Sequence, residues 1–431
     1  MSDTDLGSLN AQTLARLFEN GEASPLEATR AALERIDRFN PAVNAYVYVD
    51  AEGAEAAAKA SARRWGQGQP LSPIDGVPIS LKDLTQVAGM PCRAGSLNRV
   101  FGATTNPWDT RLTPGGSSGG AAVAAALNMG VLHQGGDSGG SIRIPAAFTG
   151  VFGFKPTYGW TPQWPPAKEP SLSHLGPITR TVRDAVSMLN VMGRYDYRDP
   201  YATRGQPECW GVDLDKGLAG LRIGYSPDLG YANVDPQIAL RVREAADRLE
   251  ALGAEIVEVN PDFCSPIDTF RKLWFTASLE QWSQMDQHQR TLLDPGMVAN
   301  ARVAEPWKAV ELFRALADRA ALTQRLEQFN QEYHLLMTPS VPIAPFEINQ
   351  EVPSGSDMHD WEEWAPFSYP FNLSQQPAAS VPCGFTDKGL PVGFQLAGGK
   401  YDDVRVLRAC HAYMEAHPPR FPSVPDPAQY A

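Results

Sequence analysis

Two short stretches of glycine and serine lie close together in the chain: a first nest at 115–120 (GGSSGG) and a second nest at 135–141 (GGDSGGS). Glycines this dense free the backbone for left-handed turns and let successive N–H groups point into one anion-binding cavity. A serine hydroxyl beside such donors suits acyl transfer, because that reaction needs a nucleophile next to an oxyanion hole. The alternative is a pair of serine-rich surface turns, but linkers lack the apolar run between the nests. The candidate nucleophiles are Ser117, Ser118, Ser138 and Ser141.

Acyl transfer also needs a base that takes the proton of the nucleophile and returns it to the leaving group. Histidine is the usual base, yet none of the seven histidines stands in a motif. Lys82 ends a short strand predicted within 76–83, where a lysine is ordinarily just a solvated strand end. GSSGG and GDSGG also fit the nucleophile elbow of α/β-hydrolases, with Ser118 or Ser138 at the centre, although no Asp and His follow in the required order. The residues alone do not identify which side chain is the base.

The composition limits what the protein can bind. The formal net charge of -12 and the lack of a Lys/Arg run argue against binding nucleic acid or an anionic membrane, and favour a neutral or cationic small molecule. The five cysteines are scattered without CxxC spacing, which favours free thiols in a reducing compartment and no zinc site. Without a signal peptide or an apolar run of membrane-spanning length, we expect a cytoplasmic protein.

Helical and extended patterns alternate along the chain, which is typical of an α/β protein. The stretch 221–259 is predicted to be strand, helix, strand, so part of the sheet is parallel. We expect a large mixed, mostly parallel sheet flanked by helices on both faces, and a long loop over 159–177. We expect residues 1–431 to form a single domain. Its parts would be a helical N-terminal part at about 8–65, a core that holds the nests at about 74–192, a βαβ and helical part at about 218–335, and closing strands with a last helix at about 335–416.

Local signals in the sequence predict where the first helices begin and end. An apolar stripe ends at Gly21, and Ser24-Pro25-Leu26-Glu27 forms a capping box with proline at the first helical position. The helix that starts there is expected to end at Pro41.

Several motifs together resemble the amidase signature family: GVPISLKDL, PGGSSGGAAVAAAL, GGDSGGSIRIPAAFTGVFGFKPTYG, GPITRTVRDA and NLSQQPAASVPCGFTDKGLPVGFQLAG. The resemblance spans about residues 8 to 415, and the pairing of GGSSGG with GGSIR is its most specific part. It implies an enzyme, a monomer or homodimer, that hydrolyses a small-molecule amide to a carboxylic acid plus ammonia or amine without metal or cofactor.

The resemblance also implies roles for individual residues. Ser141 would be the nucleophile, Ser117 the bridging serine after a cis Gly116–Ser117 peptide, and Lys82 the base. A lysine excluded from water loses its proton well below pH 10.4, which suits that role. The oxyanion hole would be the backbone N–H groups of Ser138, Gly139, Gly140 and Ser141. Groups that hold the nests would be Ser118, Asp137 and Arg143.

One departure from the family pattern follows Leu97, where members usually carry a further helix and strand. Without that unit we expect exposed apolar surface and a displaced Lys82. Three functions therefore stay open: a free-standing amidase, the A subunit of a tRNA-dependent amidotransferase, and a non-catalytic amidase-like protein.

The substrate is the least constrained part of the prediction. Ligand pockets are mostly apolar with a few polar anchors. Aromatic residues in proline-rich loops are therefore candidates for lining the mouth of the site, although loop packing explains them equally well: Trp160, Trp361, Trp364 and Phe367.

Overall fold

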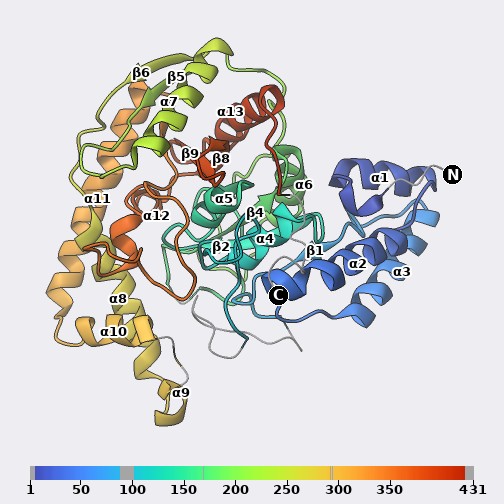
Figure 1. Cartoon of the computed structure of the whole chain (residues 1–431), viewed down its shortest axis with the longest axis horizontal. Helices are drawn as coiled ribbons and strands as arrows, with labels where there is room; N and C mark the ends of the chain where they lie inside the picture. Colours follow the sequence, from blue (N-terminus) through green and yellow to red (C-terminus); the bar gives the residue numbers. More distant parts are fainter. Residues whose placement is uncertain (1–4, 88–100, 168, 292, 294, 423–431) are drawn as a thin grey trace.

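A computed structural model of the chain describes residues 5–87, 101–167, 169–291, 293 and 295–422. The strands of these residues form one nine-stranded sheet (Figure 1). Their order across the sheet is β1-β2-β4-β3-β8-β9-β7-β5-β6. In chain order the strands are β1 (Ile79–Ser80), β2 (Leu132–Asp137), β3 (Phe152–Lys155), β4 (His174–Thr179), β5 (Arg222–Tyr225), β6 (Glu255–Glu258), β7 (Leu335–Pro339), β8 (Ala378–Phe385) and β9 (Pro391–Gly398).

The sheet is mixed, as the sequence predicts, but the expectation that it is mostly parallel is wrong. Three of the eight strand pairings, β1–β2, β5–β6 and β5–β7, are parallel and five are antiparallel. Parallel neighbours need a long crossover, whereas antiparallel neighbours can be joined by a short turn. The closing strands β8 and β9 are separated only by residues 386–390 and pair antiparallel for that reason.

Helices cover both faces of the sheet, as predicted (Figure 1). Leu335 and Met337 of β7 belong to an apolar core with α6, α7 and α13, whereas Leu336 between them belongs to a core with α8, α11 and α12. Helix α5 lies on this second side, where Gly153 of β3 faces Ala146. The helices are α1 (Ala11–Asn20), α2 (Pro25–Val43), α3 (Ala51–Gly66), α4 (Gly119–Ala126), α5 (Arg143–Thr149), α6 (Val182–Met192), α7 (Pro236–Ala251), α8 (Ile267–Ser283), α9 (Gln287–Thr291), α10 (Pro295–Ala304), α11 (Ala309–Glu332), α12 (Tyr369–Leu373) and α13 (Asp403–Ala416), with short 3-10 turns η1 (Leu6–Ser8) and η2 (Trp361–Trp364).

The N-terminal helices follow their local signals with one exception. Helix α1 ends at Gly21 in the left-handed conformation, and α2 begins with the predicted capping box of Ser24 and Glu27. The expectation that α2 ends at Pro41 is wrong. Pro41 lies in the last turn of α2, where its missing N–H costs a single hydrogen bond, and the helix ends at Asn44, whose φ is 49°.

Two strands, β2 and β4, were not predicted from the sequence. Strand β2 carries LHQGGD, which includes the start of the second nest, and β4 occupies the end of 159–177, which was expected to be loop throughout. Strand β4 lies between β2 and β3 and is mostly buried, so it lacks the alternation of apolar and polar residues that marks a half-exposed strand.

Two further findings concern the described residues as a whole. No helix among them is long and apolar enough to cross a membrane. The cysteines among them are free thiols, as predicted, namely Cys209, Cys264, Cys383 and Cys410, and Cys92 lies outside the described residues.

Candidate active site

The parallel pairing of β1 and β2 brings Lys82 next to both nests. The register pairs Ile79 with Leu132, so the two strands run in the same direction and end at the same edge of the sheet. Lys82 stands two residues after the end of β1, and 138–141 follow β2 directly. The first nest leads into α4, which packs against β2. Three segments that are far apart in the chain therefore meet at one point.

Lys82 is buried, and its amine faces the first nest. The side-chain nitrogen Nζ donates to Ser117 Oγ at 2.7 Å and to the Gly136 carbonyl at 3.1 Å. Its backbone N–H donates to Gln134 Oε1 at 3.1 Å, which fixes the end of β1. The residue is only 8% exposed, and burial lowers the pKa of Lys82 to about 8. A neutral amine is therefore accessible near physiological pH.

The two nests are tied together by their backbones. The N–H of Ser118 donates to the Ser141 carbonyl at 3.2 Å, and the Gly116–Ser117 peptide is cis, as the resemblance implies. Ser118 Oγ bonds to both backbone groups of Gly136, at 3.2 Å each, so this hydroxyl is engaged in holding the first nest against β2. Ser117 and Ser141 are only partly buried. Ser118 and Ser138 are buried, so Ser117 and Ser141 are the more exposed of the four candidate serines.

A buried ion pair holds the second nest in shape. Asp137 and Arg143 are both fully buried and lie 2.9 Å apart. The Asp137 carboxylate also accepts the backbone N–H of Gly140 at 2.8 Å and of Ile142 at 3.2 Å. Burial alone would raise the pKa of the Asp137 carboxyl, but the charge and hydrogen bonds of Arg143 hold it well below its ordinary value. Further partners of the pair come from distant segments, namely Asn372, Ser368 and Gln395.

The backbone of the second nest offers the donors of an oxyanion hole, but not all four that were expected. Gly140 N–H already donates to Asp137 Oδ1, so it is not available to a substrate. This corrects the expectation for Gly140, and the cause is the carboxylate that folds back to cap the turn. The N–H groups of Ser138, Gly139 and Ser141 stay as candidate donors beside the helix start of α5.

Aromatic rings cover this turn at Gly139. A Cβ placed on Gly139 would lie 2.7 Å from Phe270 Cζ and 2.8 Å from Trp361 Cη2. The Phe270 and Trp361 rings meet edge to face at 5.8 Å, and Trp274 stacks on Phe270 at 5.7 Å. Trp361 thus lies beside the second nest together with Phe270 and Trp274 of α8, and its role in lining the substrate pocket stays a prediction.

The other three aromatic candidates lie elsewhere, which corrects the prediction for each of them. Trp160 is buried in the core on the opposite face of the sheet, where it meets Trp210 edge to face. Trp364 stacks on Phe148 of α5 at 6.0 Å. Phe367 is fully buried in the core with α8, α11 and α12. Large apolar side chains in these loops are taken up by packing, since burial of their area is favourable wherever a core is near.

We expect Gly139→Ala to raise KM for amides with a bulky acyl group about tenfold, because the added methyl must displace the ring of Phe270 or Trp361 that covers Gly139. Gly66→Ala is the matched control, since a Cβ at Gly66 meets nothing within 4 Å. Steady-state kinetics of both variants check this. An unchanged KM in Gly139→Ala would mean that the rings do not contact the substrate.

The histidines do not complete a hydrolase elbow. His133 bonds to Ser80, His174 bonds to the carbonyls of Leu172 and Asp137, and His411 bonds to Asp215. Within the described residues, none bonds to Ser118 or Ser138. In that same part of the chain, no group of three or more His, Cys, Asp or Glu side chains is arranged to hold a metal ion.

Comparison with known proteins decides the family. The family model described as Amidase matches residues 27–99 and 96–407. The chain belongs to the amidase signature family. As a member it is an amide C–N hydrolase. It is 33% identical to an acylamidase of Rhodococcus erythropolis, over 97% of each chain, and 32% identical to the A subunit of the glutamyl-tRNA(Gln) amidotransferase of Myxococcus xanthus, over 97% of this chain and 98% of that one.

Solved structures of the amidase signature family share the fold. A bacterial aryl acylamidase superposes with a TM-score of 0.87 at 26% identity, covering 95% of this chain and 96% of that one. The 6-aminohexanoate cyclic dimer hydrolase reaches the same TM-score of 0.87 at 23% identity, covering 98% and 100%. The second likeness concerns the fold alone.

The departure from the amidase signature pattern after Leu97 lies outside the described residues, but its surroundings are visible. The alignment with the acylamidase extends over 466 positions against a chain of 431 residues, so at least 35 positions face gaps in this chain. Strand β1 is the edge of the sheet, and the apolar side chains of Ile79 and Leu81 are 53% and 47% exposed there. The expected exposed apolar surface is thus present. The expected displacement of Lys82 is not, because its amine contacts Ser117.

Proposed function

We propose that this chain is a free-standing amidase that hydrolyses a small aryl or acyl carboxamide through an acyl-enzyme on Ser141. One observation carries the proposal: the buried amine of Lys82 lies 2.7 Å from Ser117 Oγ, and the peptide that follows Ser117 is tied to Ser141 by the Ser118 N–H. The first contact supports a proton path from Ser117 to the Lys82 amine, and the proposal extends this path from Ser117 to the hydroxyl of the partly exposed Ser141.

The reaction begins with proton transfer. Neutral Lys82 takes the proton of Ser117, and Ser117 takes that of Ser141 as the Ser141 oxygen attacks the carbonyl carbon. The N–H groups of Ser138, Gly139 and Ser141 stabilise the oxyanion of the tetrahedral intermediate. The C–N bond breaks as the proton returns from Lys82 through Ser117 to the leaving nitrogen. Water then attacks the acyl-enzyme with the same proton path, and the carboxylic acid leaves.

A second candidate is the A subunit of a tRNA-dependent amidotransferase, which the 32% identity to the Myxococcus xanthus protein favours. The aryl acylamidase structure and the acylamidase relative favour the free-standing enzyme instead. Purified chain, assayed alone for ammonia or amine release from simple amides, separates the two. Turnover without any partner supports the proposal, and turnover only in the presence of the other amidotransferase components contradicts it.

The third possibility is a non-catalytic relative, which the departure from the family's sequence pattern after Leu97 favours. The position of Lys82 argues against it, because a disabled site has no need to keep a buried amine against a serine hydroxyl. Covalent labelling of Ser141 by a fluorophosphonate supports catalysis, and a cooperatively folded chain that fails to label contradicts it.

We expect kcat/KM for a neutral amide to rise about tenfold per pH unit up to an inflection near pH 8 and to level off above it. Burial lowers the pKa of Lys82 to about 8, and only the neutral amine can accept a proton. Rates between pH 6 and 10 check this. A profile that is flat over pH 6 to 9 would contradict a lysine base.

A further inference from the structure

The Asp137 carbonyl belongs to the same peptide group as the N–H of Ser138, one of the candidate oxyanion donors. This carbonyl accepts a hydrogen bond from His174 Nδ1 at 3.2 Å and another from Asn372 Nδ2 at 3.0 Å. In the part of the chain that the structure describes, no protein group accepts a hydrogen bond from the Ser138 N–H. One end of the peptide is therefore held by side chains, and the other end is free to bind a substrate.

The two ends of this peptide point to opposite edges of β2. The Asp137–Ser138 peptide is trans, so its C=O and N–H point in opposite directions. The Asp137 carbonyl points to the β4 edge, where His174 begins that strand. The Ser138 N–H therefore points to the β1 edge, where the Gly136 carbonyl of β2 accepts from the Lys82 amine. The free N–H thus faces the side of β2 that carries the proposed base.

The neighbours of His174 determine which ring nitrogen carries the proton. Nδ1 lies 2.7 Å from the Leu172 carbonyl oxygen and 3.2 Å from that of Asp137, and carbonyls only accept, so Nδ1 carries the hydrogen. Burial lowers the pKa of His174 well below its ordinary value, so the ring is neutral and Nε2 has no proton. Nε2 is buried and has no hydrogen-bond partner within the described residues. The polar contribution of this ring is therefore its Nδ1–H.

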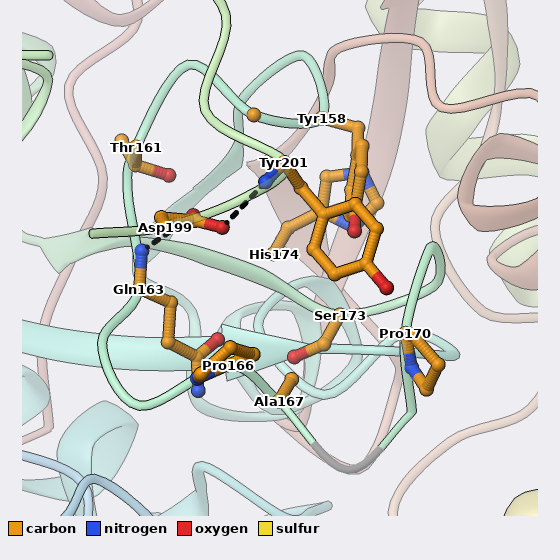
Figure 2. Close-up of a pocket in the computed structure, with 11 residues that line it drawn as sticks. Tyr158, Thr161, Gln163, Pro166, Ala167, Pro170, Ser173, His174, Asp199 and Tyr201 are labelled. Atoms are coloured by element: carbon orange, nitrogen blue, oxygen red, sulfur yellow. Dashed lines mark hydrogen bonds between the residues drawn. The ribbon is translucent and has the colours of Figure 1, made fainter. Parts of the chain in front are cut away.

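Packing holds the His174 ring in this orientation. The imidazole meets the Tyr158 ring edge to face, with 5.4 Å between the ring centroids, and Figure 2 shows both side chains. The Tyr158 hydroxyl accepts the Ser171 N–H at 2.9 Å, and the Ser171 carbonyl accepts from Arg319 at 2.8 Å. The Nδ1–H donor is therefore in place before a substrate binds, and a preorganised donor needs no rearrangement during the reaction.

We propose that His174 is a positioning residue of the oxyanion hole, which holds the Asp137–Ser138 peptide so that the Ser138 N–H points at the developing oxyanion. The inference rests on the proposed amidase function, because it needs a tetrahedral intermediate on Ser141. A hydrogen bond to the carbonyl of a peptide also polarises the N–H of that peptide, which makes the N–H a stronger donor. His174 acts through Ser138 and does not touch the substrate.

The choice of variant follows from what each side chain also holds. Asn372 bonds to the Asp137 carboxylate at 2.8 Å and to Arg143 at 2.7 Å, so its loss would disturb the buried ion pair as well. His174→Leu removes the Nδ1–H donor and leaves those bonds in place. His174→Asn keeps a donor, because the Nδ2 of an asparagine can take the position of the imidazole Nδ1.

The test compares an inhibitor that forms an oxyanion with one that cannot. With the ketone 1,1,1-trifluoro-4-phenylbutan-2-one, the Ser141 oxygen bonds to the carbonyl carbon and the carbonyl electron pair moves to the oxygen. The Ser141 proton passes through Ser117 to Lys82. The corresponding alcohol, 1,1,1-trifluoro-4-phenylbutan-2-ol, has no carbonyl to attack and only binds. The ratio of the two inhibition constants therefore reports stabilisation of the oxyanion apart from binding.

We expect His174→Leu to lower kcat for acetanilide about tenfold with little change in KM, and to raise the inhibition constant of the ketone about tenfold while that of the alcohol stays the same. His174→Asn should bring both quantities to within about threefold of the wild type. His288→Leu replaces an exposed histidine on α9 and should match the wild type throughout. Urea titration of each variant shows whether its fold is kept.

Three results would overturn the inference. They are a wild-type inhibition constant for the ketone in His174→Leu, an equal rise for ketone and alcohol, which a purely structural role would give, and a His174→Asn enzyme as impaired as His174→Leu. In each case hydrolysis of acetanilide by the wild type would show that the proposed amidase function holds. If His174→Leu does not fold, His174→Phe replaces it, because it also lacks the donor and keeps a ring against Tyr158. A wild type that neither hydrolyses simple amides nor binds the ketone would remove the proposed function and the inference together.

Discussion

Replacing Ser141 by alanine is expected to lower kcat/KM for any amide substrate about a million-fold and to abolish labelling by a fluorophosphonate. Ser141 is the partly exposed serine that ends the second nest and is tied through Ser118 to the first nest. Without its oxygen no acyl-enzyme forms, and the remaining donors only bind the substrate. Intact-mass analysis after incubation with the reagent measures the loss directly.

Ser138→Ala is the matched control for the nucleophile. Ser138 is in the same nest and at the centre of the alternative elbow, yet no histidine of the described residues bonds to it, and only its backbone N–H enters the proposed mechanism. We expect this variant to label at a rate within about tenfold of the wild type, since its N–H is kept. If Ser138→Ala were the variant that fails to label, the nucleophile would be Ser138, and the elbow hypothesis would replace the present one.

Lys82→Ala is expected to lower kcat/KM about ten-thousand-fold, which is the upper range for loss of a general acid–base group. Its amine is the group that contacts Ser117, and the described residues place no histidine there to substitute for it. The change leaves Ser141 and its donors in place, so KM should change much less than kcat. Steady-state kinetics at pH 9 separate the two effects.

Lys59→Ala controls for the loss of a lysine as such, because Lys59 is on α3 and bonds to Glu55 in solvent. Circular dichroism and a urea titration of Lys82→Ala show whether the fold is kept. A folded Lys82→Ala enzyme with wild-type kcat would remove the lysine from the proton path.

Much of the fold follows from local signals in the sequence. The capping box at Ser24, the glycine stop at Gly21 and the strand, helix, strand pattern of 221–259 all correspond to observed elements. Strand β4 could not be predicted because it is buried between neighbours and carries glycine and proline. Apart from the parallel pair within 221–259, the directions of neighbouring strands could not be predicted, because they depend on which strands become neighbours in the folded sheet. The single-domain division stays a prediction.

The part of the site that is built from residues close together in the chain could be predicted from the sequence. The part contributed by distant segments could not. The nests, Asp137 and Arg143 follow one another in the chain, and their contacts agree with expectation. Phe270 lies more than a hundred residues later on a helix with no distinguishing pattern, so its place over Gly139 is a product of packing alone. Trp160 shows the opposite error, because an aromatic residue in a proline-rich loop can equally be taken up by a core.

The account depends on Lys82 being the group that titrates in the proton path to Ser141. The direct test is the rate constant for fluorophosphonate labelling of Ser141 against pH, measured in the wild type and in Lys82→Ala. The account predicts that the wild-type rate rises to an inflection near pH 8, in line with the pKa of about 8 for the buried amine, and that this inflection disappears in the slower variant. The same inflection in both proteins would contradict it.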